Sequence, residues 1–577
     1  MLGGVLRLRA IMKRCPQCNR IATDNLLAFC RVDGARLVQD SGSLIDSETI
    51  ALLPDTPAVE TSAKHVSVSE PSLPIDPSSL SRSTGPTRKL IKRTKRRIGV
   101  VAIAAMIALA LVSSAYFSLS SKNNPTISSL AVLPFINVNA DDELEYLSDG
   151  MTETLISDLS QLPKLNVKAH SSVLRYKGKD ASPHTVGADL NVQAILNGRI
   201  ILRGELLTLS LELADARTEN VIWSKQYTRR QTDLVSLQSE IARDITNNLR
   251  VKLAGADEQK LSKKYTNNTE AYELYLKGRF YWNKRTLKDL EKALDYFNQA
   301  IALDPNYVLA YAGLADTYVL LPLYRNEPVR EAMQPAREAA LKALSLDGDL
   351  AEPHATLGRV NANEYDFAGA EREYKRAIEL DPNYATAHQW YGILLFDLAR
   401  NEESQAELRW ALEIDPLSLI INSYYADSLF YARRYDDATG QLKKTLELNT
   451  EYATTYQRFA KFYMASGNYA EAAKSYATYR ELIGDQQSAT LVRESFSKGG
   501  WPVFLRAITA NEQLARLTPY EAVVFLSAAG EKEKALAELE RSYEVFGPLL
   551  RIEPLLDPLR GDPRFAGVLA RAGLSQG

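Results

Sequence analysis

Three cysteines and one aspartate near the start of the chain have the types and spacing of a metal site. Cys15 and Cys18 form a Cys-x2-Cys pair, and Asp33 follows Cys30 where a second pair would place its last cysteine. Zinc takes four tetrahedral ligands, and a carboxylate oxygen can serve as one of them. We therefore predict a structural zinc ion bound by Cys15, Cys18, Cys30 and Asp33. A site closed by four protein ligands leaves no position for a substrate. The alternative is that all three thiols are free.

The residues around Cys30 extend this pattern. Residues 29–34 read FCRVDG and match the form F-C-x-x-D-G. On these residues the segment 12–38 resembles the short zinc ribbons found at the start of many bacterial membrane and signalling proteins. The residues before Met12 have no counterpart in the ribbon, so either Met1 or Met12 is the true start, and we favour Met12.

Side chains suited to catalysis are sparse in the rest of the chain. The histidines have no ligand-like spacing, and they are His65, His170, His184, His354 and His388. We find no phosphate-binding glycine loop and no nucleophile with a nearby base, which enzyme sites of these classes require. The sequence therefore predicts a protein that is not an enzyme.

Residues 98–119 form a continuous apolar stretch without a charged side chain. As a helix the stretch would be roughly 33 Å long, enough to cross the hydrocarbon core of a bilayer. Seven lysines and arginines lie within 88–97, whereas acidic residues dominate 141–145. Because basic flanks stay in the cytoplasm, we predict a single-pass inner-membrane protein with a cytoplasmic N-terminus and an extracytoplasmic C-terminal bulk. The alternatives are a buried core helix and a cleaved signal peptide.

The segment before this stretch has the composition of a linker. Residues 39–97 are rich in Ser, Pro, Thr and Asp and end in the basic run. Such a segment cannot bury enough apolar surface to fold alone. The basic run sets topology and can contact the lipid bilayer. The whole chain has a net charge of −2, so we expect no nucleic-acid binding.

The segment 128–254 alternates strand and helix signals, which is typical of an α/β layer with one helix-covered sheet. The predicted strands are 129–135, 165–169, 192–202, 205–214 and 219–228, and the predicted helices are 143–162, 185–190 and 233–253.

Several short runs in this segment carry a family resemblance. They are 130–135 (LAVLPF), 146–153 (YLSDGMTE), 172–179 (SVLRYKGK), Gly198 and 222–224 (IWS). On these runs the segment resembles the TolB-like N-terminal family, which precedes tetratricopeptide repeats in bacterial proteins. The family sometimes occurs with cyclase or transcription-factor functions. Those activities need domains of their own, which we do not find in this chain.

The remaining chain repeats with a fixed period. Asp347, Asp381, Asp415 and Asn449 recur every 34 residues, and Gly358, Gly392, Ala426 and Ala460 keep the same interval. This period and the small residues at close helix contacts are typical of tetratricopeptide repeats, each a helix–turn–helix. We predict about six repeats over 268–484, and a degenerate pair with a C-terminal cap over 500–577. The predicted units are 270–306, 307–349, 350–383, 384–417, 418–451 and 452–484.

Stacked repeats form a concave groove lined by the first helix of each pair. The phase of the repeat predicts the groove positions Arg359, Asn363, Gln389, Asp397, Asp427, Tyr431, Gln457 and Lys461. This mixed polar and aromatic surface suits a protein or peptide ligand. The pattern leaves open the sequence of that ligand and the sign of its charge. For each position alone, an ordinary solvated surface is the alternative.

These observations predict a multidomain chain made of a small zinc ribbon, one transmembrane helix, an α/β TolB-like domain and an all-α tetratricopeptide superhelix. The predicted function is a non-enzymatic, membrane-anchored scaffold or sensor that binds protein partners outside the cytoplasm. The alternative is an accessory subunit of a signalling enzyme, associated with a cyclase or regulator, or a transmembrane transcription-control protein. The partner and the oligomeric state are left open.

Overall fold

The computed structural model describes residues 13–14, 21–22, 38–39, 127–139, 144–249, 255–325, 327, 329 and 331–574. The chain divides into two units, Met1–Ala105 and Met106–Gly577. The predicted zinc ligands and membrane segment lie outside the described residues, as does the predicted linker except for Gln39. Within the described ranges, no helix combines the length and the apolar character that a membrane span requires.

The N-terminal unit contains three short strands, β1 (Lys13–Arg14), β2 (Ile21–Ala22) and β3 (Val38–Gln39). They form an antiparallel sheet in the order β2-β1-β3. In the sequence, Cys15 and Cys18 stand between the residues of β1 and those of β2, outside the described residues.

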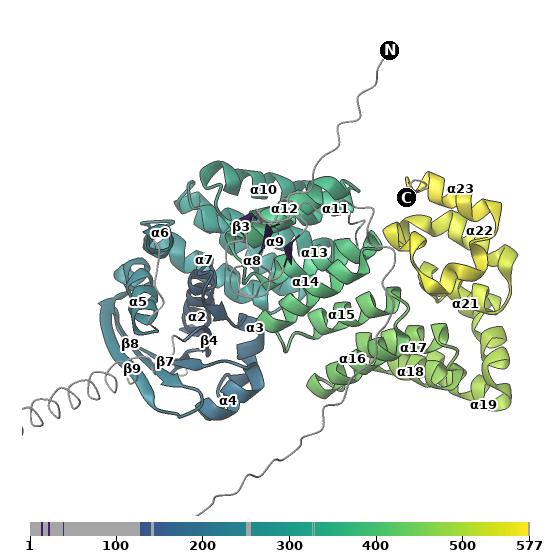
Figure 1. Ribbon diagram of the computed structural model, residues 1–577, viewed down its shortest axis with the longest axis horizontal. Coiled ribbons are helices and arrows are strands. Elements are labelled where there is room, and N and C mark those ends of the chain that lie inside the picture. The colour runs from purple at the N-terminus through teal and green to yellow at the C-terminus, as the bar shows by residue number, and fades with distance from the viewer. Residues whose placement is uncertain are drawn as a thin grey trace, which may run out of the picture. The chain divides into compact units, whose positions relative to one another are not determined.

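The second unit begins with a mixed α/β domain. Its sheet has the order β6-β4-β7-β8-β9, with β5 pairing to β7. Strand β4 is parallel to β6 and β7, whereas β7, β8 and β9 form an antiparallel meander. Helices α2 and α5 lie on the side of the sheet that faces α7 (Figure 1). The elements are β4 (Ser129–Val132), β5 (Ile136–Asn137), α2 (Glu145–Ser160), β6 (Asn166–Val167), α3 (His170–Val173), α4 (Pro183–Leu190), β7 (Ala194–Arg203), β8 (Leu206–Asp215), β9 (Val221–Arg230) and α5 (Leu234–Asn248).

The predicted order of strands and helices is confirmed, and three details differ, the first being the short helix α3, which was not predicted. The predicted strand 129–135 ends at Val132, because Pro134 has no N–H for the ladder. The chain pairs again as β5, which the sequence pattern did not show. Between β7 and β8 only Gly204 and Glu205 intervene, and Gly204 adopts a φ of +61° that such a tight connection favours.

The all-α part consists of antiparallel helix pairs with the predicted period. Small residues sit where paired helices approach closely: a Cβ added at Gly358 would lie 2.6 Å from the Tyr374 ring, and one at Gly392 would lie 2.6 Å from Leu408. The pairs are α7 (Thr269–Asn283) with α8 (Leu287–Leu303), α9 (Val308–Arg325) with α10 (Gln334–Leu346), α11 (Ala351–Asn363) with α12 (Phe367–Leu380), α13 (Ala385–Asp397) with α14 (Asn401–Ile414), α15 (Leu419–Tyr431) with α16 (Tyr435–Leu448), and α17 (Ala453–Ala465) with α18 (Tyr469–Leu482).

The repeated aspartates fix the loops between successive pairs. Asp381 Oδ1 accepts a hydrogen bond from the backbone N–H of Asn383 at 2.9 Å, and Asp304 makes the same contact with Asn306 at 3.1 Å. Such a side-chain-to-backbone bond two residues ahead stabilises a tight turn. The chemistry of the turn therefore explains why Asp or Asn recurs at this position.

A further helical region follows the regular repeats. Helix α19 is kinked at Gly499 and Gly500, and the last helices share a small core around Leu536 and Phe546. The elements are α19 (Gln486–Ile508), α20 (Asn511–Leu514), α21 (Pro519–Ala528), α22 (Lys532–Ser542), the 3-10 turns η5 (Tyr543–Val545), η6 (Gly547–Arg551) and η7 (Pro554–Leu559), and α23 (Pro563–Arg571). Helix α6 (Gly255–Ser262) and the turns η2 (Leu174–Tyr176), η3 (Gln231–Asp233) and η4 (Glu331–Met333) complete the unit.

The α/β domain and the first repeats share one hydrophobic core, which runs from Leu130 to Leu357. Buried charges cross the junction: Arg279 of α7 pairs with Glu153 of α2 and lies 3.5 Å from Asp316 of α9. Further along, Ser172 Oγ donates to Asp415 at 2.5 Å. The domain is thus joined to the array by both apolar and polar contacts.

Candidate functional site

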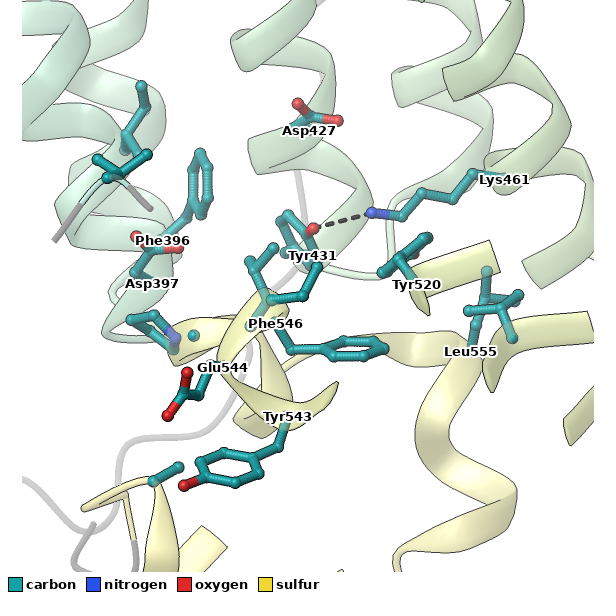
Figure 2. Close-up of a pocket in the computed structure, with 18 of the residues that line it drawn as sticks. Phe396, Asp397, Asp427, Tyr431, Lys461, Tyr520, Tyr543, Glu544, Phe546 and Leu555 are labelled. Carbon is teal, nitrogen blue, oxygen red and sulfur yellow. Dashed lines mark hydrogen bonds between the residues drawn. The ribbon is translucent and has the colours of Figure 1, made fainter. Parts of the chain in front are cut away.

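The concave side of the array contains a cavity of about 1310 Å³. Helices α11, α13, α15 and α17 supply one wall, and residues of the C-terminal region supply the other. In Figure 2, Tyr543, Glu544 and Phe546 of the C-terminal region lie across from Phe396 and Asp397 of α13. We call this cavity, with the helix faces that line it, the groove.

The groove contains most of the residues that the repeat phase singled out. The lining includes Arg359, Asn363, Asp397, Asp427, Tyr431, Gln457 and Lys461. Gln389 was predicted to join them but does not line the cavity. It is only 8% exposed on α13, a helix that is buried along most of its length.

The charges of the groove differ in how they are compensated. Arg458 pairs with Asp427 at 2.8 Å, so this part of the wall is internally neutral. Burial raises the pKa of the Asp397 carboxyl to about 7, and the nearby Arg359 guanidinium opposes that rise. Among the described residues, no carboxylate lies within ion-pair distance of Arg359. Asn363 also lines the cavity, and its Nδ2 is buried without a hydrogen-bond partner in the described part of the chain.

Lys461 is a largely buried cation of the groove. Its Nζ donates to the Tyr431 hydroxyl at 2.8 Å, as Figure 2 shows, and lies 3.0 Å from Glu553 Oε2. The Lys461 side chain is 16% exposed and the Glu553 side chain is fully buried. The Tyr520 hydroxyl also donates to Glu553 at 2.9 Å. A buried charge persists only when it is paired and hydrogen-bonded in this way.

The C-terminal wall of the groove was not predicted from the sequence. Glu553 stands among Leu549, Leu550, Ile552 and Leu555 in the chain. A single acidic residue within an apolar run is a signal for a buried, paired carboxylate, but it does not identify the partner.

The histidines of the array are engaged inside the fold. His388 is 3% exposed, and its Nδ1 lies 2.7 Å from Glu407 while its Nε2 lies 3.0 Å from the carbonyl of Pro382. In the repeat before that of His388, the Nδ1 atom of His354 lies 2.6 Å from Glu373 in the same manner. Both nitrogens of the His388 ring are therefore committed to structural contacts. In the described ranges, no group of three or more His, Cys, Asp or Glu side chains is arranged to hold a metal ion.

Comparison with known families separates the two parts of this unit. Residues 126–244 match the second domain of HilA/YgeH-like transcriptional regulators. Residues 274–307 match a tetratricopeptide repeat. The chain therefore carries a HilA/YgeH-like second domain followed by tetratricopeptide repeats. The resemblance to the TolB-like family stays a prediction.

Two curated relatives extend this likeness. The putative adenylate cyclase 3 of Rhizobium meliloti (strain 1021) is 30% identical over 236 residues, which cover 40% of this chain and 40% of the relative. The transcriptional regulator HilA of Salmonella typhimurium is 23% identical over 283 residues, which cover 48% of this chain and 49% of the relative. The chain thus spans less than half the length of each of these relatives.

Solved tetratricopeptide proteins also match part of this chain. One is a thermophilic tetratricopeptide protein of Thermus thermophilus, which is 21% identical, covers 34% of this chain and 99% of its own, and gives a TM-score of 0.29.

Proposed function

We propose that residues 127–574 form the partner-binding module of a signalling or transcription-control protein, and that a peptide segment of a protein partner is the ligand of the groove. The observation that carries this proposal is the cavity of about 1310 Å³ on the concave side of the array, lined by aromatic, polar and charged side chains. A concave surface of this kind is what repeat arrays use to bind partners.

The relatives support the signalling context. Their names refer to two different outputs, adenylate cyclase and transcriptional regulator. A module shared by proteins with different outputs is better suited to binding or sensing than to either output itself. In this proposal the module is not an enzyme, and it acts on another component of the system.

We further propose that residues 98–119 anchor the module to the inner membrane, with the N-terminus in the cytoplasm and the array outside it. This part rests on the sequence alone: an apolar stretch of membrane-spanning length with a basic N-terminal flank. A structural zinc ion on Cys15, Cys18, Cys30 and Asp33 would stabilise the cytoplasmic end.

Photo-cross-linking in the native host tests the binding function. A photoreactive amino acid replaces Gln457 in the groove of the full chain, and a matched variant carries it at the exposed Lys444 of α16. We expect a defined partner to cross-link at position 457 and not at position 444. Arg359→Glu should reduce that yield about tenfold. The same set of products from both positions would reject the groove as the binding site.

A further inference from the structure

Residues 547–557, which we call the strap, run along one side of the groove. Leu549 and Ile552 of the strap pack against the aromatic cluster that includes Phe430 and Phe462 of α15 and α17. At one end, Gly547 lies close to the Tyr365 hydroxyl, which a Cβ at Gly547 would meet at 3.6 Å. The strap therefore contacts the array at several successive repeats.

The other end of the strap is held by charge. Asp557 lies 2.9 Å from Arg433, in the turn between α15 and α16, and both side chains are about half exposed. Glu553 lies between this exposed pair and the apolar contacts, and it is the buried anchor of the strap.

The two faces of the strap have different roles. Leu550 and Leu556 belong to the C-terminal core with Phe565 and Val568 of α23. Leu549, Ile552, Glu553 and Asp557 face the array instead. Repeats five and six (α15 to α18) thus contact a short segment of two aliphatic side chains followed by a carboxylate. This is how a repeat array would hold a peptide from another protein.

The surroundings of Lys461 explain why a carboxylate is required there. Its ammonium group lies 4.7 Å from the centre of the Phe430 ring and 4.6 Å from that of Tyr431. These rings exclude water, and a desolvated ammonium group left without a partner is costly. A neutral or basic segment at this place would leave Lys461 unpaired, so the site selects an acidic segment.

We propose that the strap is an internal ligand of repeats five and six, and that the partner segment which binds there is an acidic peptide with aliphatic flanks that competes with the strap. The proposal rests on the proposed function and gives the chemistry of its partner. In the unliganded chain the strap occupies the site, so a partner must match or exceed its contacts.

Binding of the strap's own sequence in trans tests this inference. The probe is a fluorescent synthetic peptide of residues 545–559, and its affinity for the full chain is measured by anisotropy. Glu553→Gln weakens the strap in the chain but leaves Lys461 in place. We expect the peptide to bind this variant at least tenfold more tightly than the unaltered chain. A peptide with glutamine at the position of Glu553 should show no such gain, and adding Lys461→Met to the variant should remove it.

Two further variants keep the test decisive. Glu481→Gln removes a surface carboxylate of α18 whose partner Arg493 also lies outside the groove, so it should leave peptide affinity unchanged. If Glu553→Gln does not fold, Arg433→Gln loosens the exposed end of the strap and should give a smaller increase in affinity. Equal affinities for altered and unaltered chains would overturn the proposal, as would equal binding of the acidic and glutamine peptides. A concentration-dependent dimer without peptide binding would instead assign the site to the strap of a second copy.

The outcome is separable from that of the cross-linking experiment. If a partner cross-links at position 457 but the peptide never competes, the groove binds partners and the internal-ligand proposal is wrong.

Discussion

Lys461 Nζ lies 3.0 Å from Glu553 Oε2, and this pair joins the sixth repeat to the C-terminal region. Removing only one member leaves the other charge buried and unpaired, which typically costs about 3–5 kcal/mol. We predict that Lys461→Met lowers the free energy of unfolding by roughly that amount. The double variant Lys461→Met, Glu553→Leu should recover much of the loss. Urea unfolding of the unaltered chain, the two single variants and the double variant gives the coupling energy of the pair. A coupling energy near zero would show that the pair does not stabilise the fold.

A second buried charge group joins the α/β domain to the array. Arg279 is 16% exposed, donates to Glu153 through its Nε at 3.0 Å, and also faces Asp316. Arg279→Ala leaves two buried carboxylates without their cationic partner, so we predict a loss of about 3–5 kcal/mol in unfolding free energy. The matched control is Arg325→Ala, whose pair with Glu291 is exposed and should contribute less than about 1 kcal/mol. Similar losses in the two variants would contradict this account of the junction.

Two glycines in the array should respond to alanine in opposite directions. A Cβ at Gly358 would lie 2.6 Å from the Tyr374 ring, whereas a Cβ at Gly440 in α16 meets no atom within 4 Å. We predict that Gly358→Ala destabilises by about 1–3 kcal/mol through overpacking. Gly440→Ala should stabilise by up to about 1 kcal/mol, because alanine is the better helix former. Thermal or urea unfolding measures both, and stabilisation by Gly358→Ala would show that the helices need no close approach there.

The buried carboxyl group of Asp381 makes a contribution to the stability of the fold that decreases as the pH rises. Burial raises the pKa of its carboxyl from 3.8 to about 6, although Ser160 Oγ and the Asn383 N–H both donate to it. The folded state therefore holds the proton more tightly than the unfolded state does. This contribution to stability is fully present below about pH 4 and is lost as the pH rises through about 6.

Asp381→Asn should remove that dependence. We predict that the unfolding free energy of the variant, relative to the unaltered chain, rises between pH 4 and pH 6 by roughly 1–3 kcal/mol and then levels off. Urea titrations at several pH values measure the difference. Parallel curves across this range would mean that the pKa of Asp381 is not raised in the folded chain.

Much of the fold follows from local pattern. The period of 34 residues placed the helix pairs, because each repeat packs only on its neighbours and repeats the same small residues at close contacts. The order of strands was also readable, since buried runs such as 129–132 and the glycine turn at Gly204 are local signals. The short strand β5 was missed, because it is only two residues long and a segment of that length carries no periodic signal.

The groove could be predicted only in part. Seven positions in phase with the repeat line the cavity, since helix geometry fixes which side chains face inward. Gln389 does not line the cavity, because packing around α13 covers it. The contact of Glu553 with Lys461 depends on the path of the chain after the last regular repeat, which no local pattern specifies. The zinc and membrane predictions concern residues outside the described ranges and stay predictions.

The central claim is that the groove binds a segment of a partner protein, and mapping cross-links from two of its positions tests this most directly. Photoreactive residues at Asn363 and Gln457, three repeats apart in the array, are compared with one at Lys444 in the full chain. We predict that positions 363 and 457 cross-link to neighbouring residues of the same partner segment, while position 444 does not. Cross-links from 363 and 457 to unrelated proteins, or equal yields at 444, would contradict the claim.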